Sequence, residues 1–549
     1  MSIPEFEEII EPNDQTAARR DHLDALRELV GNVYPNKFDR SRLTGDEDTI
    51  TSILSWTPVV EAAREMADLK ATLAEGERPP AKFKDSLNER LKALWTVRFA
   101  GRLTTPPRGN FVHLTDGKNK LQIYCDKKGG FALIKNDGQG TVDSENGWTA
   151  WKLIDHGDFV GVEGYLFVTN TGEVSVHVEK LQFLSKAMLP MPDKMHGIAD
   201  PEIKQRQRYV DLIDSSLRVE QSVEAVERES AIRNPQSAIS TREVFERRAR
   251  LVSSLRRFLE DHGYIEVETP MLTPKATGAA AKPFETHHNA LDITLYARIA
   301  PELYLKRLVV GGFEKVYELN RNFRNEGISF KHNPEFTMLE FYCAYMDVNG
   351  MMDLCEHMLR EAIRTATGGL TIKYEGNEID FSKFERVPMR DAIAKYAPDV
   401  EITDSNIVDL FDQHVESNLI QPTFIIDYPK SISPLSKADP SRPQVAERFE
   451  LFINGMEVAN GFSELNDPRE QYDRFVDQMQ ARERGDEEAM VLDEDYIRAL
   501  SYGMPPAAGI GVGIDRLTML LTNKHSIRDV ILFPHLRPER KQVEEETSE

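Results

Sequence analysis

The chain has 549 residues, of which 40% are hydrophobic, so it is long enough to form two or three domains. No apolar run approaches the roughly 18 residues of a membrane span, and the first residues are acidic and amphipathic, so we expect a cytoplasmic protein that neither crosses a membrane nor is secreted. The net charge of -23 argues against a general nucleic-acid binder but leaves local RNA contacts open, and three scattered cysteines are too few for a disulfide framework or a structural zinc site.

Residues 1–94 are predicted to be a helical region. Apolar side chains recur at helical spacing, at Leu23, Leu26 and Leu29, and a polar break follows at residues 76–84. This region carries no recognisable chemistry, and its role stays open.

Residues 95–190 are predicted to form a small closed β-barrel. Five short segments of alternating apolar and polar residues, separated by Gly, Asn, Asp and Pro turns, run from Trp95 to Phe183. Such a set of strands is typical of an OB-fold, a barrel that exposes one face to oligonucleotides.

Two side chains of this barrel are candidates for RNA contact. Alternation turns Leu121 and Ile123 inward and leaves Gln122 outside, beside Phe111 on the neighbouring strand. An exposed aromatic ring beside an amide can stack on one base and read the edge of another. The alternative is that Phe111 belongs to the core and Gln122 is an ordinary solvated residue.

Residues 191–240 form a connector to a second large domain, expected at 241–549. Ser240, with Glu243 three residues later, forms a capping box that predicts the start of a helix, and Gly263 predicts its end. A strand is predicted over residues 264–270. A generic helix–strand unit has the same pattern, so this part indicates no function by itself.

Segment 318–345 is predicted to be a strand–loop–strand unit that holds charged ligands, because it combines arginines, acids, a histidine and aromatic residues. Alternation along its second strand puts Glu340 and Tyr342 on one face, which suits a cationic side chain. The same reasoning puts Asn460, Phe462 and Glu464 on one face of a later strand. Two acids that line one pocket repel each other unless a cation lies between them, and the ε-ammonium of lysine fits that need.

Segment 503–521 brings three glycines up to Arg516, at the start of an apolar helix pattern. Gly509, Gly511 and Gly513 alternate along a predicted strand, where the missing side chains let a bulky ligand approach the backbone. A GxGxG pattern alone is more often a packing feature, so its meaning depends on its combination with segment 318–345.

The dipeptide Asn454-Gly455 predicts a two-residue hairpin turn. Pairing across that turn sets Phe452 opposite Glu457 and leaves Glu450 and Glu457 as diagonal neighbours on one face. Two carboxylates so placed are typical of Mg²⁺ ligands that share the ion with substrate phosphates; the alternative is an exposed acidic hairpin.

Strict alternation, however, puts Glu457 on the strand face opposite to Asn460. A site that contains both residues therefore requires a β-bulge or a strong twist, which we expect near Gly461.

Together, segments 318–345 and 503–521 resemble motifs 2 and 3 of the class II aminoacyl-tRNA synthetases. HNPEFTMLEFY (332–342), APELYLKRL (300–308) and NGFSELNDP (460–468) are similar to the lysine-specific, bacterial-type members. The likeness runs from about residue 95 to the end. It implies an α+β fold, with an antiparallel-sheet catalytic domain at 241–549 after an OB-fold that binds the tRNA anticodon, and a homodimer whose interface includes the unit that begins at residue 240.

The sequence departs from this family in two places. The loop at residues 104–110 is usually longer and more basic, so anticodon contacts are in doubt there. Residues 215–240 resemble an insertion of unknown role.

The resemblance also implies roles for individual residues. Activation of an amino acid joins two anions, its carboxylate and the α-phosphate of ATP, and arginine is the side chain best suited to bind both. Arg324 is implied to bridge these groups, and Arg516 to hold the γ-phosphate. The other implied ligands are Glu326, His332, Asn333, Phe336 and Gly513 for ATP; Gly278, Glu302, Glu340, Tyr342, Asn460, Phe462 and Glu464 for lysine; Glu450 and Glu457 for Mg²⁺; and Phe111, Gln122 and Glu173 for the anticodon.

The resemblance implies a homodimeric ligase that makes lysyl-adenylate from L-lysine and ATP and passes the lysyl group to the 3′ end of tRNA(Lys). Three alternatives remain: a ligase that lysylates a protein, an aspartyl or asparaginyl synthetase, and a non-catalytic RNA-binding module with the same fold. The barrel argues against the first and the acidic pocket against the second, while Arg324, Glu450, Glu457 and Arg516 together argue against the third. The choice of lysine requires that Glu340 and Glu464 lie close together and that no internal cation neutralises either.

Overall fold

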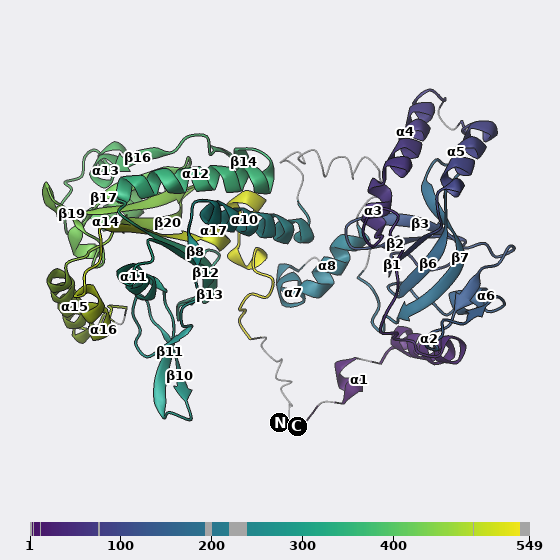
Figure 1. Ribbon diagram of the computed structural model, residues 1–549, viewed down its shortest axis with the longest axis horizontal. Helices are drawn as coiled ribbons and strands as arrows, with labels where there is room; N and C mark the ends of the chain where they lie inside the picture. Colours follow the sequence, from purple (N-terminus) through teal and green to yellow (C-terminus); the bar gives the residue numbers. More distant parts are fainter. Residues whose placement is uncertain are drawn as a thin grey trace, which may run out of the picture. The chain divides into compact units, whose positions relative to one another are not determined.

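The computed structural model describes residues 3, 5–10, 12–74, 77–192, 200–218, 239–486 and 488–538. The chain divides into two compact units, Met1–Arg233 and Asn234–Glu549 (Figure 1). Residues 219–238, which make up most of the segment that resembles an insertion, lie outside the described part. None of the described helices is long and apolar enough to span a membrane.

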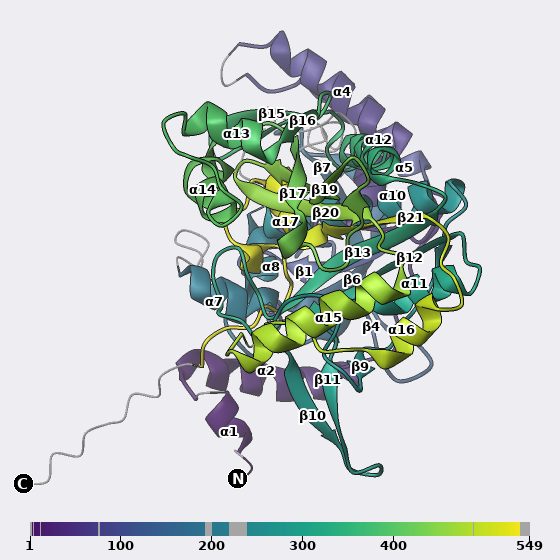
Figure 2. The ribbon, with the colours of Figure 1, turned by 90° about the vertical axis from the view of Figure 1, so that its left-hand side faces the viewer.

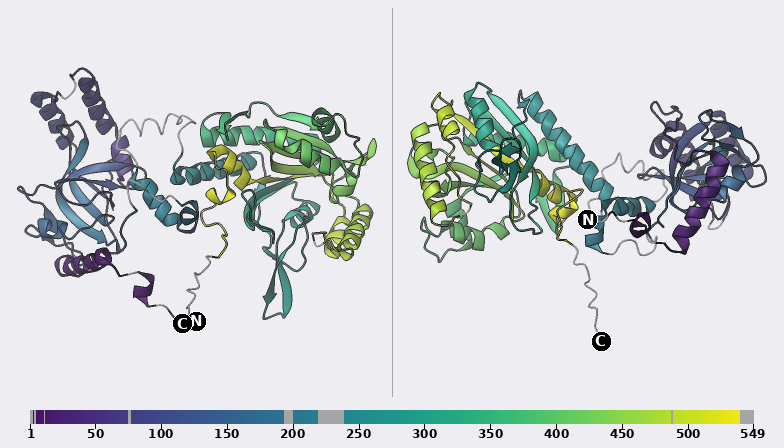
Figure 3. Two further views of the ribbon diagram at one scale, coloured as in Figure 1. Left: turned by 180° about the vertical axis from the view of Figure 1, so that it is seen from behind. Right: turned by 90° about the horizontal axis from the view of Figure 1, so that it is seen from below.

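Unit 1 begins with helices, as predicted, but residues 31–49 between two of them are not helical. Leu26 is fully buried, with Leu23 and Leu29 packed beside it at the edge of the core, so the predicted apolar stripe is confirmed. Helices α4 and α5 extend from the barrel as a pair (Figure 3). The helices of unit 1 are α1 (Phe6–Ile9), α2 (Asp14–Val30), α3 (Ile50–Ser55), α4 (Thr57–Ala71), α5 (Ala81–Ala93), α6 (Gly147–Trp151), α7 (Pro201–Arg206) and α8 (Arg208–Leu217).

The predicted barrel is confirmed. Strands β3, β2, β1, β6 and β7 are hydrogen-bonded in that order, and β3 also pairs in parallel with β7, which closes the ring. Leu121 and Ile123 point into the core and have no exposed surface. The strands are β1 (Val97–Leu103), β2 (Phe111–Thr115), β3 (Lys120–Tyr124), β6 (Phe159–Val168) and β7 (Val174–Ser185), continued by the short β4 (Ala132–Ile134) and β5 (Val142–Asp143).

Unit 2 begins with α10 (Thr241–Asp261). The Ser240 side chain accepts a hydrogen bond from the Glu243 amide at 3.2 Å, and Gly263 follows the helix in the left-handed region, at φ 81°, so both predicted ends are confirmed. The strand predicted over 264–270 is too long, since only β8 (Ile265–Glu266) pairs with its neighbour. The last backbone hydrogen bond from this segment to β12 is from the Val267 amide to the Tyr317 oxygen at 2.9 Å, three residues before Pro270, which has no N–H to donate.

Unit 2 is built on a nine-stranded sheet in the order β16-β17-β19-β20-β21-β13-β12-β8, with β18 paired to β19. In the described part, β16–β17 and β12–β8 are parallel pairs, and the other pairs are antiparallel. Its other strands are β12 (Lys315–Phe323), β13 (Glu335–Ala344), β16 (Glu385–Pro388), β17 (Thr423–Pro429), β18 (Ala438–Asp439), β19 (Arg442–Ile453), β20 (Met456–Ser463) and β21 (Ala507–Gly513).

Helices cover both faces of this sheet. Helices α10, α12 (Val348–Thr367) and α17 (Ile514–Thr522) pack on one face around the main core (Figure 1). Helices α11 (Glu302–Val310), α15 (Pro468–Glu483) and α16 (Glu494–Leu500) lie together on the other face, around a second core that includes Tyr342 and Tyr496 (Figure 2). The predicted α+β class, an antiparallel catalytic sheet after an N-terminal barrel, is therefore confirmed.

The remaining elements of unit 2 are peripheral. Strands β9 (Leu272–Thr273), β10 (Phe284–His288) and β11 (Ile293–Ala297) form a small sheet whose β10–β11 hairpin projects from the unit (Figure 2). The others are β14 (Thr371–Tyr374), β15 (Asn377–Asp380), α13 (Met389–Tyr396), α14 (Ile407–His414), η1 (Glu416–Asn418), η2 (Lys430–Ile432) and η3 (Ile527–Asp529).

Candidate active site

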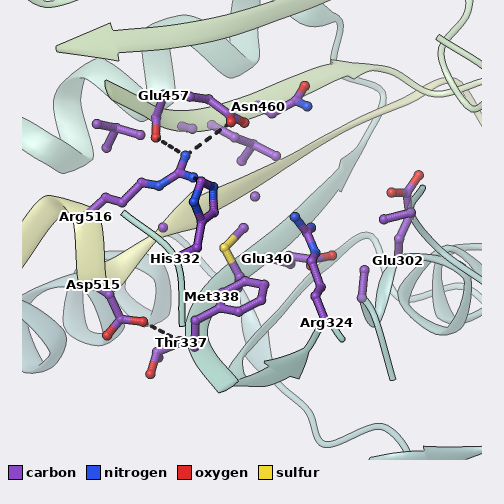
Figure 4. A pocket seen from close by; sticks show the side chains of 18 of the residues that line it. Glu302, Arg324, His332, Thr337, Met338, Glu340, Glu457, Asn460, Asp515 and Arg516 are labelled. Atoms are coloured by element: carbon purple, nitrogen blue, oxygen red, sulfur yellow. Dashed lines mark hydrogen bonds and ion pairs between the residues drawn. The ribbon is translucent and has the colours of Figure 1, made fainter. Parts of the chain in front are cut away.

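One pocket of unit 2 brings together most of the predicted ligand-binding residues. Arg516, His332 and Glu457 lie toward one end of it, and Arg324 and Glu302 toward the other (Figure 4). Glu450 and Glu464 do not line it. The predicted residues that do are Gly278, Glu302, Arg324, Glu326, His332, Asn333, Phe336, Glu340, Tyr342, Glu457, Asn460, Phe462, Gly513 and Arg516.

Strands β13, β20 and β21 supply most of the pocket's lining, and β12 pairs with β13 beside it. The residues of β12 and β13 pair from Lys315 with Cys343 to Phe323 with Glu335, so the predicted strand–loop–strand unit is confirmed. Along β13, Leu339 and Phe341 enter the core under α10 and α12, and the residues that alternate with them, Met338, Glu340 and Tyr342, line the pocket. The hydrophobic alternation of a single strand thus places Glu340 and Tyr342 in the site.

At the first end of the pocket, Arg516 lies in the first turn of α17 and is held by groups from two other segments. Its Nη1 donates to the Glu457 backbone oxygen at 2.8 Å and lies 3.2 Å from Oε2 of Glu457. Its Nη2 lies 3.3 Å from Nε2 of His332, and burial together with the Arg516 charge lowers the pKa of His332. A neutral imidazole beside a fixed guanidinium is suited to bind an anion.

Arg324 directly follows β12 and has no ion-pair partner among the described residues. Its guanidinium lies over the ring of Phe336, with 5.1 Å between the guanidinium carbon and the ring centroid. Its Nε is buried and donates to no acceptor in the described part of the chain. An arginine left unneutralised at a pocket wall has its hydrogen-bonding capacity available for a carboxylate or phosphate.

The other end of the pocket is acidic and buried. Burial, reinforced by the nearby charge of Glu302, raises the pKa of Glu340 to about 8. Burial likewise raises the pKa of Tyr342, with the charges of Glu302 and Glu340 adding to the effect. Burial also raises the pKa of Glu464, although Lys306 opposes the shift. An added positive charge would favour the ionised form of each of these groups.

Glu464 departs from the prediction. It lies just beyond β20, is 1% exposed, and its Oε2 is 2.5 Å from Nζ of Lys306. An internal cation therefore does pair with one of the two acids. The requirement that none does so was too strict, because one Lys306 lies in a cluster with three acids, Glu302, Glu340 and Glu464. Oε1 of Glu464, however, has no hydrogen-bond partner among the residues that the structure describes, so one oxygen remains available.

The glycines of β21 are needed by the protein itself as well as by a ligand. A Cβ at Gly509 would lie 2.3 Å from the Tyr342 ring and 2.4 Å from Oε1 of Glu464, and a Cβ at Gly511 would lie 2.9 Å from the Met338 methyl. The predicted reason, ligand access, is thus incomplete, because at Gly509 a side chain would displace two of the pocket's own groups.

The predicted hairpin at Asn454-Gly455 is confirmed, and both residues have positive φ, 49° and 65°, as the turn requires. The required bulge exists but lies at Val458 instead of near Gly461. The pairing passes from Leu451–Ala459 to Phe452–Glu457, which leaves Val458 as the extra residue. This bulge lets Glu457 and Asn460 line the same pocket.

Glu450 does not line the pocket. Its oxygens accept from the Tyr428 hydroxyl at 2.9 Å and from Arg448 at 2.5 Å. Burial raises the pKa of Glu450 to about 7; Arg448 opposes the shift and the charge of Glu457 adds to it. No cluster of three or more metal-binding side chains is found in the described segments of the chain.

The three predicted anticodon residues lie on the barrel of unit 1. Phe111 is 47% exposed, as predicted, and its ring centroid is 4.7 Å from that of Tyr124. Gln122 was expected to be exposed, but it is only 9% exposed, because β7 pairs with β3 and covers it. Its amide donates to Glu173 at 2.8 Å and accepts from Ser175 at 2.9 Å. Gln122 and Glu173 therefore form one polar cluster.

Three residues that sequence reasoning did not single out belong to the site. Asp515 accepts from the Thr337 amide at 2.7 Å and fixes β13 to α17, and Lys331 donates to the Gly455 oxygen at 2.8 Å, which fixes the motif 2 loop to the hairpin. Lys306 pairs with Glu464. The spacing of Lys306 four residues after Glu302 on a predicted helix was a signal that could have indicated an ion pair.

Comparisons with known proteins agree with the resemblance. The family described as tRNA synthetases class II (D, K and N) matches residues 227–537, and an OB-fold nucleic acid binding domain matches residues 97–184. A lysine–tRNA ligase of Ralstonia nicotianae is 45% identical over 96% of this chain and 96% of its own length. Those of Cupriavidus metallidurans and Dichelobacter nodosus are 44% and 48% identical, over 96% and 81% of this chain and 96% and 88% of their own lengths. The chain therefore belongs to the class II tRNA synthetases and, within them, to the lysine–tRNA ligases.

Proposed function

We propose that the protein joins L-lysine to ATP, forming lysyl-adenylate and diphosphate, and then transfers the lysyl group to the 3′ end of tRNA(Lys) with release of AMP. The observation that carries this proposal is a single pocket with arginines for anions and a buried acidic end for amines. No side-chain nucleophile is needed, because the carboxylate of lysine itself attacks the α-phosphorus.

The charge of the acidic end supports lysine as the substrate. Glu302, Glu340 and Glu464 contribute three carboxylates, and Lys306 neutralises one of them. Lysine carries two ammonium groups, which match the two remaining negative charges. We assign the ε-ammonium to Glu464, Tyr342 and Glu340, and the α-ammonium to Glu302 and the backbone of Gly278; an aspartate side chain would be repelled.

Asn460 and Phe462 complete the proposed lysine site, as an amide and an aromatic wall beside the aliphatic chain. For ATP, we assign the α-phosphate to Arg324 and the γ-phosphate to Arg516 with His332. The adenine would stack on Phe336, with Glu326, Asn333 and Gly513 as further contacts.

We propose Glu450 and Glu457 as ligands of a Mg²⁺ ion that neutralises the phosphates of ATP. Repulsion from Glu457 adds to the burial that raises the pKa of Glu450, and a divalent cation would relieve both costs. The ion would share Glu450 with Tyr428 and Arg448, which bind its two oxygens. Two carboxylates suit an ion that takes its other ligands from phosphates and water. In the described residues Glu457 is paired with Arg516, so its carboxylate lies beside the side chain that we assign to the γ-phosphate.

The proposal assigns Phe111, Gln122 and Glu173 to the anticodon of tRNA, with the exposed ring of Phe111 stacking on a base. It also includes a homodimer, which is supported by the exposed Ile265 on the edge strand β8. The proposal also includes a cytoplasmic location, where tRNA and ATP are both available. Sedimentation of the purified protein tests the dimer.

The decisive experiment is amino-acid-dependent exchange of pyrophosphate into ATP, measured with each of the twenty amino acids. Strong exchange with lysine alone is expected. Exchange with aspartate or asparagine, or with no amino acid, contradicts the proposal. Charging of tRNA(Lys) but of no other tRNA then tests the second step.

Raising the pH is expected to lower KM for lysine by roughly tenfold per unit below pH 8. With its pKa raised to about 8, Glu340 is mostly protonated in the empty pocket at neutral pH, whereas an ammonium ligand requires the carboxylate, so binding releases a proton. KM values for lysine and for ATP, measured between about pH 6.5 and pH 8.5, check this. Glu340→Gln should raise KM for lysine and flatten its pH dependence. A wild-type KM that does not change over this range would remove Glu340 from the amine site.

A further inference from the structure

Lys306 is an internal cation at the acidic end of the pocket. It lies on α11 with a fully buried side chain, and its Nζ is 2.6 Å from Oε1 of Glu302 and 2.5 Å from Oε2 of Glu464. The same Nζ lies 5.1 Å from the centroid of the Phe462 ring. Lys306 therefore joins two acids that come from separate parts of the fold, α11 and the end of β20.

Burying the charge of Lys306 costs free energy unless other charged groups compensate for it. A buried lysine loses its hydration, and only well-placed carboxylates compensate for that loss. The charges of Glu302 and Glu464 outweigh burial and raise the pKa of Lys306, so it stays protonated. The hydroxyl of Tyr496 faces the same cluster and has no hydrogen-bond partner in the described part of α16 or its neighbours.

Lys306 pairs with Oε2 of Glu464 and leaves Oε1 available to a ligand, and it keeps Glu302 at the pocket wall. Oε1 of Glu464 is buried without a hydrogen-bond partner among the described residues, close to Gly509 and Tyr342. Glu302 lines the pocket near Gly278. The ammonium of Lys306 holds one oxygen of Glu302 and one of Glu464. The distance between these two carboxylates is therefore fixed.

We propose that Lys306 is a positioning residue that sets the length of the diamino acid accepted, by fixing Glu302 and Glu464 at the separation of the two amines of lysine. This inference rests on the proposed function. Ornithine is shorter than lysine by one methylene, so its amines cannot reach both fixed acids at once. One methylene changes kcat/KM roughly 10- to 200-fold in a well-packed pocket, and we assign part of that discrimination to Lys306.

The test is Lys306→Met, which keeps the aliphatic chain and removes the charge. KM for lysine in pyrophosphate exchange is expected to rise roughly 10- to 100-fold, and the lysine-to-ornithine ratio of kcat/KM to fall about tenfold. The matched control is Lys186→Met. Lys186 is likewise a fully buried lysine paired with two acids, Asp155 and Asp158, but it lies in the barrel. The control should lose stability and keep the ratio.

Two further variants keep the inference testable if Lys306→Met does not fold. Lys306→Arg keeps the charge but spreads it over a planar fork, and it should also lower the ratio. Lys306→Ala, supplied with propylammonium, should recover exchange with lysine, whereas propan-1-ol should not restore it.

The outcomes separate the two proposals. If the wild-type protein shows no lysine-dependent exchange, the proposed function fails. If the wild-type protein is active and folded variants at position 306 keep the lysine-to-ornithine ratio, Lys306 is only structural and the inference is overturned.

Discussion

Arg324→Ala is expected to lower kcat/KM for lysine-dependent pyrophosphate exchange by about a thousandfold. The guanidinium has no ion-pair partner among the described residues, so its charge is available for the two anions that must meet. The lysine carboxylate and the α-phosphate repel each other more strongly in the transition state than in the bound ground state. Loss of Arg324 should therefore lower kcat more than it raises KM. Pyrophosphate exchange measured at saturating lysine and ATP checks this.

The matched control for this prediction is Arg321→Ala. Arg321 lies on β12, three residues before Arg324, but its side chain is 39% exposed and faces Glu335 at 3.7 Å rather than the pocket. Surface pairs of this kind contribute little, so exchange should change less than about threefold. If Arg324→Ala keeps a tenth or more of the wild-type rate, Arg324 does not bridge the reacting anions.

Much of the site could be predicted from the sequence, because it depends on local rules. Alternation with period two gives the pocket face of β13, and Asn454-Gly455 gives the hairpin and its pairing. Both follow from the geometry of one strand or one turn. The family resemblance then indicated that segments 318–345 and 503–521 belong to one site, which the alternation within each segment does not show.

The remaining features depend on contacts between distant segments. The bulge at Val458 arises where the hairpin meets β21, so the sequence indicated that it was needed but not its position. The burial of Gln122 depends on closure of the barrel by β7. The pairing of Lys306 with Glu464 joins residues that are far apart in the chain, and alternation within one strand contains no information about such a contact.

Glu464→Gln is expected to raise KM for lysine about a hundredfold and to change KM for ATP less than about twofold. A hydrogen bond between charged groups contributes about 1.5–3 kcal/mol, and an amide keeps the shape but not the charge. Oε1 of Glu464 is the oxygen without a hydrogen-bond partner among the described residues, so the loss should fall on the amine and not on the phosphates, which we assign to Arg324 and Arg516.

Loss of the buried pair with Lys306 could also weaken the fold, so the control must remove a similar charge nearby. Asp493→Asn does this, since Asp493 is 7% exposed and its Oδ2 lies 2.5 Å from Arg307, outside the pocket. Both variants should lower the temperature of unfolding, but only Glu464→Gln should raise KM for lysine. An unchanged KM for lysine in Glu464→Gln would mean that Glu464 serves only to hold Lys306, and that the ε-ammonium is bound by Glu340 and Tyr342 alone.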